Sequence, residues 1–154
     1  MALLLVGDFC PLATQEATFM DINESLHRIL QAKDGLAKMF YDHFLEKHPE
    51  FRPMFAAVDF NRQRILLTTA LMVIERYRAH PTAAVEQYLQ YLGTKHREMA
   101  IPRAAYAKWT VAMLETMQKF HGDDWSEEAE QQWQSAIEQA RDLMLQGYDQ
   151  RITV

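Results

Sequence analysis

The chain has 154 residues, of which 49% are hydrophobic and 24% are charged, and its formal net charge is −5. This length suits a single domain, and the composition is that of a folded globular protein rather than a disordered one. The acidic balance argues against a nucleic-acid-binding surface, which depends on clustered Lys and Arg. With one cysteine, Cys10, these residues form neither an internal disulfide nor a paired-cysteine metal site, so we expect a reducing, cytoplasmic setting.

The N-terminal segment differs in character from the rest of the chain. Its apolar run, residues 2–6, is too short to span a bilayer and lacks the basic start of a signal peptide. We expect residues 1–20 to form a leader and residues 21–154 to form one globular domain, with no membrane association.

The first half of the chain shows helical periodicity and no sustained alternation of the strand type. A first helix is predicted to open at Asp21, with Glu24 as its capping-box partner. Pro49 is predicted to start a short stretch that ends at Phe55. The apolar stripe of the first helix is Ile22, Leu26, Ile29 and Leu30, and that of a second helix after Gly35 is Leu36, Met39, Phe40, His43 and Phe44.

The second half continues the same pattern. A long helix is predicted from Asp59 to Arg78, a further one over 82–97, one from Pro102 to Phe120, and a last one that Ser126 caps and that ends near Gln146. Their stripes are Leu67, Ala70, Leu71 and Ile74; Val85, Tyr88, Leu89 and Leu92; Tyr106, Trp109, Met113, Met117 and Phe120; and Ala129, Trp133, Ile137, Ala140 and Met144. We therefore predict an all-α fold of six to eight helices.

His96 is the histidine whose position best suits a functional role. It continues the stripe of the 82–97 helix by one turn, so its ring is predicted to point inward. One interpretation is a core histidine that bonds a backbone carbonyl. The other is a metal or haem ligand, whose second ring nitrogen donates to a carbonyl such as that of Leu92. Zinc-cluster, nucleophile-elbow and phosphate-loop motifs do not occur in the sequence.

Two stretches carry a resemblance to a known family. Residues 40–55, FYDHFLEKHPEFRPMF, together with Lys95, His96, Ile101 and Tyr106, resemble the microbial globins. The match over residues 21–150 is closest to the globin domain of flavohaemoglobins and to bacterial single-domain haemoglobins. The resemblance implies a globin fold around a haem pocket, with haem b as cofactor and His96 as the iron ligand.

The resemblance also implies the residues that surround the haem and its ligand. Tyr41, Gln63 and Leu67 are expected to face the bound gas. The haem-contacting set is Phe40, Phe55, Leu67, Leu92, His96, Ile101, Tyr106 and Trp109.

Other roles are open for some of these residues from the sequence alone. Tyr41 could place its hydroxyl at the surface, and Gln63 could be solvated. A slip in helix register would bring Asn61 or Arg64 into the pocket instead. Arg62 and Arg64 could reach the haem propionates.

One departure from the flavohaemoglobin pattern bears on function. Gln150 falls where those proteins carry a glutamate that makes the proximal histidine more electron-rich. We therefore expect reversible binding of O2, and also of NO or CO, for oxygen transport, storage or sensing. One alternative is a nitric oxide dioxygenase that relies on a separate reductase; another is a haem-free sensor module. The chain is expected to be a monomer or a homodimer.

Overall fold

The computed structural model describes residues 19–150, which form six α-helices and two 3-10 helices and contain no strand. The elements are α1 (Ile22–Gln31), α2 (Gly35–Lys47), η1 (Pro49–Phe55), α3 (Phe60–Ala79), α4 (Ala83–Glu98), α5 (Ala105–His121), η2 (Gly122–Asp124) and α6 (Glu127–Asp149). The all-α prediction is confirmed. All but the last two residues of the expected leader lie outside the described range. Among the described helices, none is long and apolar enough to cross a membrane.

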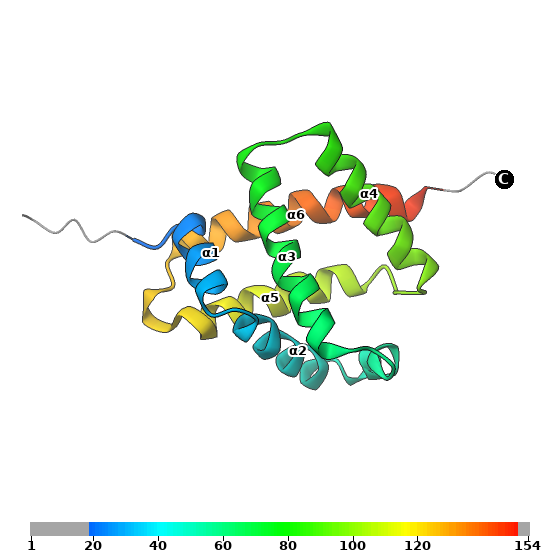
Figure 1. The fold of residues 1–154 in the computed structure, drawn as a ribbon, viewed down its shortest axis with the longest axis horizontal. Coiled ribbons are helices and arrows are strands. Elements are labelled where there is room, and N and C mark those ends of the chain that lie inside the picture. Colours follow the sequence, from blue (N-terminus) through cyan, green and yellow to red (C-terminus); the bar gives the residue numbers. More distant parts are fainter. Residues whose placement is uncertain (1–18, 151–154) are drawn as a thin grey trace, which may run out of the picture.

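The helices cross at steep angles instead of forming a parallel bundle. In Figure 1, α3 passes in front of α5 and α6, and α4 crosses α6 diagonally. Helix α4 packs most extensively on α6, and α2 packs on α5. Helices α3 and α4 are not among the closely packed pairs of described helices.

Side-chain caps define where most helices begin. Asp21 accepts a hydrogen bond from the Glu24 amide at 2.8 Å, and Ser126 accepts one from the Ala129 amide at 3.0 Å, both as predicted. The reciprocal half of the capping box does not appear, because the Glu24 carboxylate pairs with Arg28. The fifth α-helix begins at Ala105 rather than at Pro102, which lies in the preceding turn.

Three apolar residues predicted for the core are exposed. They are Leu30, Met39 and Tyr88, and each directly precedes or follows a buried residue of the same stripe. Neighbours on a helix are about 100° apart, so only one of each pair faces inward. The buried member is Ile29, Phe40 or Leu89.

A buried polar network joins α1, α5 and α6. The Trp133 indole donates to the Ser25 hydroxyl at 2.8 Å, and that hydroxyl lies 2.8 Å from Nε2 of His121. Because the indole can only donate, the Ser25 proton is free to donate to a neutral His121. Burial is the main cause that lowers the pKa of His121 to about 4.

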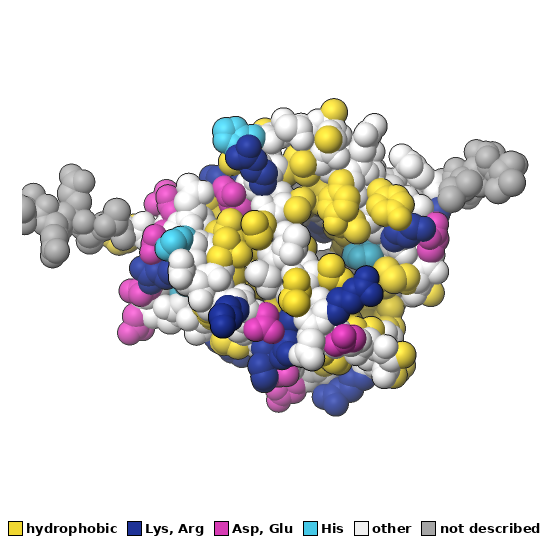
Figure 2. Space-filling model, in the orientation of Figure 1, with side chains coloured by type: hydrophobic (Ala, Val, Ile, Leu, Met, Phe, Trp, Pro, Cys, Tyr) yellow, Lys and Arg dark blue, Asp and Glu magenta, His cyan; other side chains and the backbone are white. Residues whose placement is uncertain are grey.

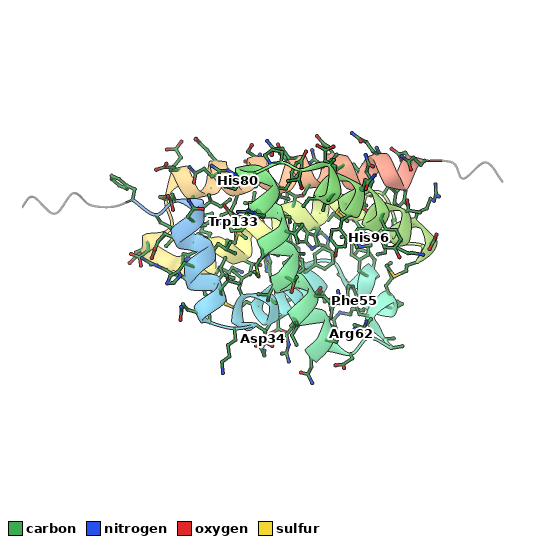
Figure 3. All side chains as sticks on the ribbon, turned by 45° about the horizontal axis from the view of Figure 1, so that its top comes forward. Asp34, Phe55, Arg62, His80, His96 and Trp133 are labelled. Atoms are coloured by element: carbon green, nitrogen blue, oxygen red, sulfur yellow. The ribbon has the colours of Figure 1, made fainter. Side chains whose placement is uncertain are left out.

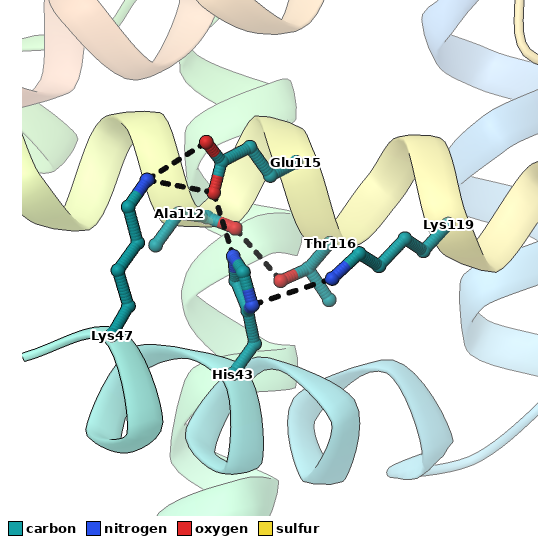
Figure 4. Close-up of polar contacts among 6 residues, drawn as sticks. All are labelled: His43, Lys47, Ala112, Glu115, Thr116 and Lys119. Atoms are coloured by element: carbon teal, nitrogen blue, oxygen red, sulfur yellow. Dashed lines mark hydrogen bonds and ion pairs between the residues drawn. The ribbon is translucent and has the colours of Figure 1, made fainter.

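A charged cluster ties α2 to α5 at the surface (Figure 4). The Glu115 carboxylate lies 2.6 Å from Nε2 of His43 and accepts from Lys47 at 2.8 Å. Lys119 lies 3.4 Å from Nδ1 of His43. Lys47, followed by His43, lowers the pKa of Glu115. These partners are partly solvated, so the cluster adds modestly to stability.

Two glycines let α4 and α6 touch backbone to backbone. A Cβ on Gly93 would lie 1.7 Å from the Met144 carbonyl oxygen, and one on Gly147 would lie 1.8 Å from that of Gln90. Neither neighbour can retreat, because both are helix backbone. Only glycine fits at either side of this crossing.

We expect Gly93→Ala and Gly147→Ala each to lower the free energy of unfolding by about 1–3 kcal/mol, because the added methyl group forces the helices apart. Urea titration followed by circular dichroism measures the change. Gly35→Ala is the matched control, since its Cβ would meet only Ala32 Cβ at 3.7 Å. Equal stability of all three variants would contradict the close crossing.

The buried histidine predicts an acid-sensitive fold. Between pH 6.5 and pH 4, the unfolded chain binds a proton at His121 that the folded protein does not bind. The free energy of unfolding should therefore fall in this window, by up to about 3 kcal/mol. His121→Gln keeps an acceptor for Ser25 but does not titrate, so its loss should be smaller in chemical denaturation at each pH. Parallel losses in both proteins would remove His121 from the acid response.

Candidate functional site

The end of α4 fixes the position of His96. Ala100 adopts a positive φ of 58°, and the Ile101 amide donates to the His96 carbonyl at 3.0 Å. The Ala100 amide donates to the Arg97 carbonyl at 2.9 Å, which completes a Schellman motif. His96 thus lies in the last turn of α4, and Ile101 directly follows the positive-φ residue Ala100.

The His96 ring has one nitrogen engaged and one free. Its Nδ1 lies 3.0 Å from the Tyr106 hydroxyl of α5. The partner is therefore this phenol and not the expected Leu92 carbonyl, because α5 approaches the ring from the side. Within the described residues, Nε2 has no hydrogen-bond partner. Burial lowers the pKa of His96, so the ring is neutral near pH 7.

Among residues 19–150, no carboxylate is hydrogen-bonded to Tyr106 or to His96. Asp149 accepts from Arg103 at 3.2 and 3.1 Å, and the Gln150 carbonyl accepts from Arg97. Burial is the main cause that raises the pKa of Tyr106 to about 12, so its hydroxyl stays protonated. The partner of His96 is thus a neutral phenol.

The side chains of Tyr41 and Gln63, which are 22 residues apart in the sequence, are hydrogen-bonded in the structure. Tyr41 lies on α2, is 6% exposed, and packs against the rings of Phe40, Phe55 and Phe60. The Gln63 side-chain amide donates to the Tyr41 hydroxyl at 2.9 Å. Burial raises the pKa of Tyr41, which keeps the hydroxyl protonated.

The helix register that brings Gln63 to Tyr41 also places its neighbours elsewhere. The Arg64 guanidinium donates to Asn61 at 2.6 Å and lies 3.1 Å from the Asp34 carboxylate. Asn61 and Arg62 are exposed. The register therefore makes Gln63, and not Asn61 or Arg64, the hydrogen-bond partner of Tyr41.

Most of the side chains that are expected to contact haem are partly buried. Those that are half-buried and pack against the core from its edge are Phe55, Leu92, Ile101 and Trp109. Leu67 is buried, and Phe40 is fully enclosed by neighbours that include Tyr41 and Trp109. Phe40 therefore supports these rings from behind.

A hollow lies between α3 and α4. Figure 2 shows it rimmed by hydrophobic side chains, with a histidine at its edge. Figure 3 places His96 at the α4 side and Phe55 on the η1 side of the same region. Among the described residues, no cluster of three His, Cys, Asp or Glu side chains could hold a metal ion.

Sequence reasoning missed three residues that shape the site. Gly93 and Gly147 hold α4 on α6, and Phe60 packs on Tyr41. An isolated glycine inside a helical pattern is a signal of close packing, so Gly93 and Gly147 could have been found. Phe60 gave no signal beyond its hydrophobicity.

Comparison with known proteins gives a consistent picture. The family model described as Globin matches residues 38–144, a span that includes Tyr41, Gln63 and His96. The chain is also similar to a Pseudomonas aeruginosa protein whose crystal structure is described as structurally highly homologous to a human hemoglobin. The two are 25% identical, the alignment covers 82% of this chain and 99% of that one, and the TM-score is 0.69. No curated protein matches the chain.

Proposed function

The chain belongs to the globin family, and we propose that it holds haem b through Nε2 of His96 and binds O2 reversibly. NO and CO would bind at the same place. One observation carries the proposal: Gln63 donates to the Tyr41 hydroxyl at 2.9 Å, so the proton of that hydroxyl is free to donate elsewhere. When bound, haem would supply the iron centre that takes a diatomic ligand.

The residues on the His96 side fit a haem. A neutral imidazole that coordinates iron through Nε2 carries its proton on Nδ1 and donates it. Tyr106 lies 3.0 Å from that nitrogen and can accept it. The flanking Leu92 and Ile101 are half-buried and apolar, as a flat macrocycle requires.

The geometry on the Tyr41 side distinguishes the two polar residues. We expected both to donate to the ligand. In the observed arrangement Gln63 donates one of its two amide protons to Tyr41 and so holds the phenol in place. We therefore assign Tyr41 as the direct donor to the ligand and Gln63 as the residue that positions it. Three rings pack around Tyr41, which is 6% exposed, and restrict its orientation. A hydrogen bond to a partly anionic ligand is stronger there than in water.

The Tyr106 contact favours ligand binding over turnover. A neutral phenol is a weaker acceptor for the Nδ1 proton of His96 than a carboxylate is. The imidazole would therefore donate less electron density to iron. The nearby carboxylate of Asp149 is occupied by Arg103. Nitric oxide dioxygenation would also need a separate reductase, and nothing in the described residues favours that alternative.

The haem proposal predicts a spectrum. The purified full chain, loaded with haem, should show a strong Soret band that shifts with CO, and His96→Ala should release haem at least about tenfold faster to a scavenging apoprotein. His27→Ala, at an exposed position of α1, is the control. A colourless protein that takes up no haem, or unchanged haem loss in His96→Ala, would reject the proposal.

The Tyr41 donor predicts slow release of O2. Tyr41→Phe should raise the O2 dissociation rate about 10- to 100-fold, the equivalent of losing a hydrogen bond to a charged acceptor, and should change CO release much less. Stopped-flow ligand replacement measures both rates.

A matched control is Tyr77→Phe. Tyr77 lies at the C-terminal end of α3, away from Tyr41, and its hydroxyl donates to Glu86 of α4. Gln63→Leu should have a smaller effect than Tyr41→Phe, because it loosens the donor without removing it. An O2 release rate in Tyr41→Phe equal to that of Tyr77→Phe would take Tyr41 out of the mechanism.

A further inference from the structure

A groove runs between α2 and the start of α3, at the lower edge of the molecule in Figure 1. Its volume is about 670 Å³, which is the size of a small-molecule site. The α2 positions that line it, 38, 41, 42, 45 and 46, recur with the helical period and so share one face of that helix. The whole lining consists of Lys38, Tyr41, Asp42, Leu45, Glu46, Arg52, Phe60 and Arg64.

The floor of the groove is apolar and largely aromatic. Tyr41 is buried, and Leu45 and Phe60 are half-buried and pack against the core. The Phe60 ring meets the Tyr41 ring edge-on, with 5.6 Å between their centroids, and stacks on Phe55. These contacts fix the rings, so the floor is a preformed surface for an apolar or aromatic group.

Two of the three cations at the rim of the groove are already engaged. Lys38 forms an ion pair with Asp42 at 2.8 Å on the same helix. The Arg64 guanidinium donates to Asn61 at 2.6 Å and lies 3.1 Å from the Asp34 carboxylate. Opposite charges this close largely cancel at a distance, so these groups add little net charge to the groove.

Arg52 and Glu46 carry the remaining charges of the rim. Nε of Arg52 donates to the Leu45 carbonyl at 3.1 Å, which holds the guanidinium beside the C-terminal end of α2. Among residues 19–150, the terminal nitrogens of Arg52 have no acceptor and the Glu46 carboxylate has no donor. The rim thus presents one cation and one anion that do not pair with each other. Figure 2 shows basic and acidic side chains close together along this lower edge.

We propose that this groove binds a zwitterion of the amino-acid type whose side chain is aromatic or branched and apolar. The carboxylate of the ligand accepts from Arg52, because the planar guanidinium fork matches a carboxylate. The ammonium group of the ligand donates to the Glu46 carboxylate. The side chain of the ligand lies on the floor formed by Tyr41 and Phe60.

A zwitterion suits this rim better than an ion of either sign. A carboxylate without an ammonium group brings a second negative charge close to Glu46. An ammonium group without a carboxylate brings a second positive charge close to Arg52. A zwitterion gives both side chains a partner and adds no net charge.

The groove shares Tyr41 with the proposed gas site, but its lining includes neither His96 nor Gln63. Binding in the groove therefore needs no haem. The inference goes beyond gas binding, and its failure would leave the haem proposal intact.

Heteronuclear NMR titration of the full chain with L-phenylalanine tests the site. The amino acid should shift the amide signals of Leu45, Glu46 and Arg52. Its Kd should be at least about tenfold lower than that of hydrocinnamate, which lacks the ammonium group, or of phenethylamine, which lacks the carboxylate. The absence of shifts up to about 10 mM amino acid, or equal Kd values for the three compounds, would overturn the inference.

Paired variants test the two charges. Arg52→Gln and Glu46→Gln should each raise the Kd for L-phenylalanine about tenfold, since each removes one charged partner. Arg52→Gln should not weaken phenethylamine binding, and Glu46→Gln should not weaken hydrocinnamate binding, because each compound lacks the group concerned. Arg76→Gln and Glu130→Gln, at exposed positions of α3 and α6, are the matched controls. If variants that circular dichroism shows to be folded bind the amino acid as the controls do, the groove does not use these charges.

Discussion

The close crossing of α4 and α6 at Gly93 and Gly147 is the constraint on which the site depends. Backbone contact draws α4 onto α6. Two further contacts strengthen this attachment, because Thr94 donates to the Gly147 carbonyl at 2.9 Å and Arg97 donates to the Tyr148 carbonyl at 2.9 Å. Helix α4 is therefore attached to α6 on one side, and its other side borders the hollow toward α3.

The hydrogen bonds on both sides of the hollow leave one functional atom free. On the α4 side, Tyr106 engages Nδ1 of His96 and leaves Nε2 without a partner. On the α3 side, Gln63 donates to Tyr41 and leaves the phenol proton available. The nearby charged side chains are paired with each other or exposed. One imidazole and one buried phenol are thus the groups through which the proposed haem and its diatomic ligand would be held.

Several features of the fold and of the site follow from local sequence. The helix starts at Asp21 and Ser126 rest on capping, a contact over three residues, and the inward direction of His96 follows from periodicity. The meeting of Tyr41 and Gln63 was predicted by family resemblance and not by spacing, because it depends on how α2 crosses α3. Leu30, Met39 and Tyr88 were predicted to face the core, and this was wrong. A pattern cannot tell which of two adjacent apolar residues faces the core.

By itself the sequence determined an all-α chain and the approximate extent of its helices, because capping and helical periodicity act within a few residues. The candidate ligand-binding residues came from the resemblance to globins. The tertiary structure alone decided that Tyr106 and not the Leu92 carbonyl contacts His96, that Asp149 pairs with Arg103, and that Gln63 donates to Tyr41. Each of these depends on the angle at which two helices cross, and that angle is set by packing between residues far apart in the chain.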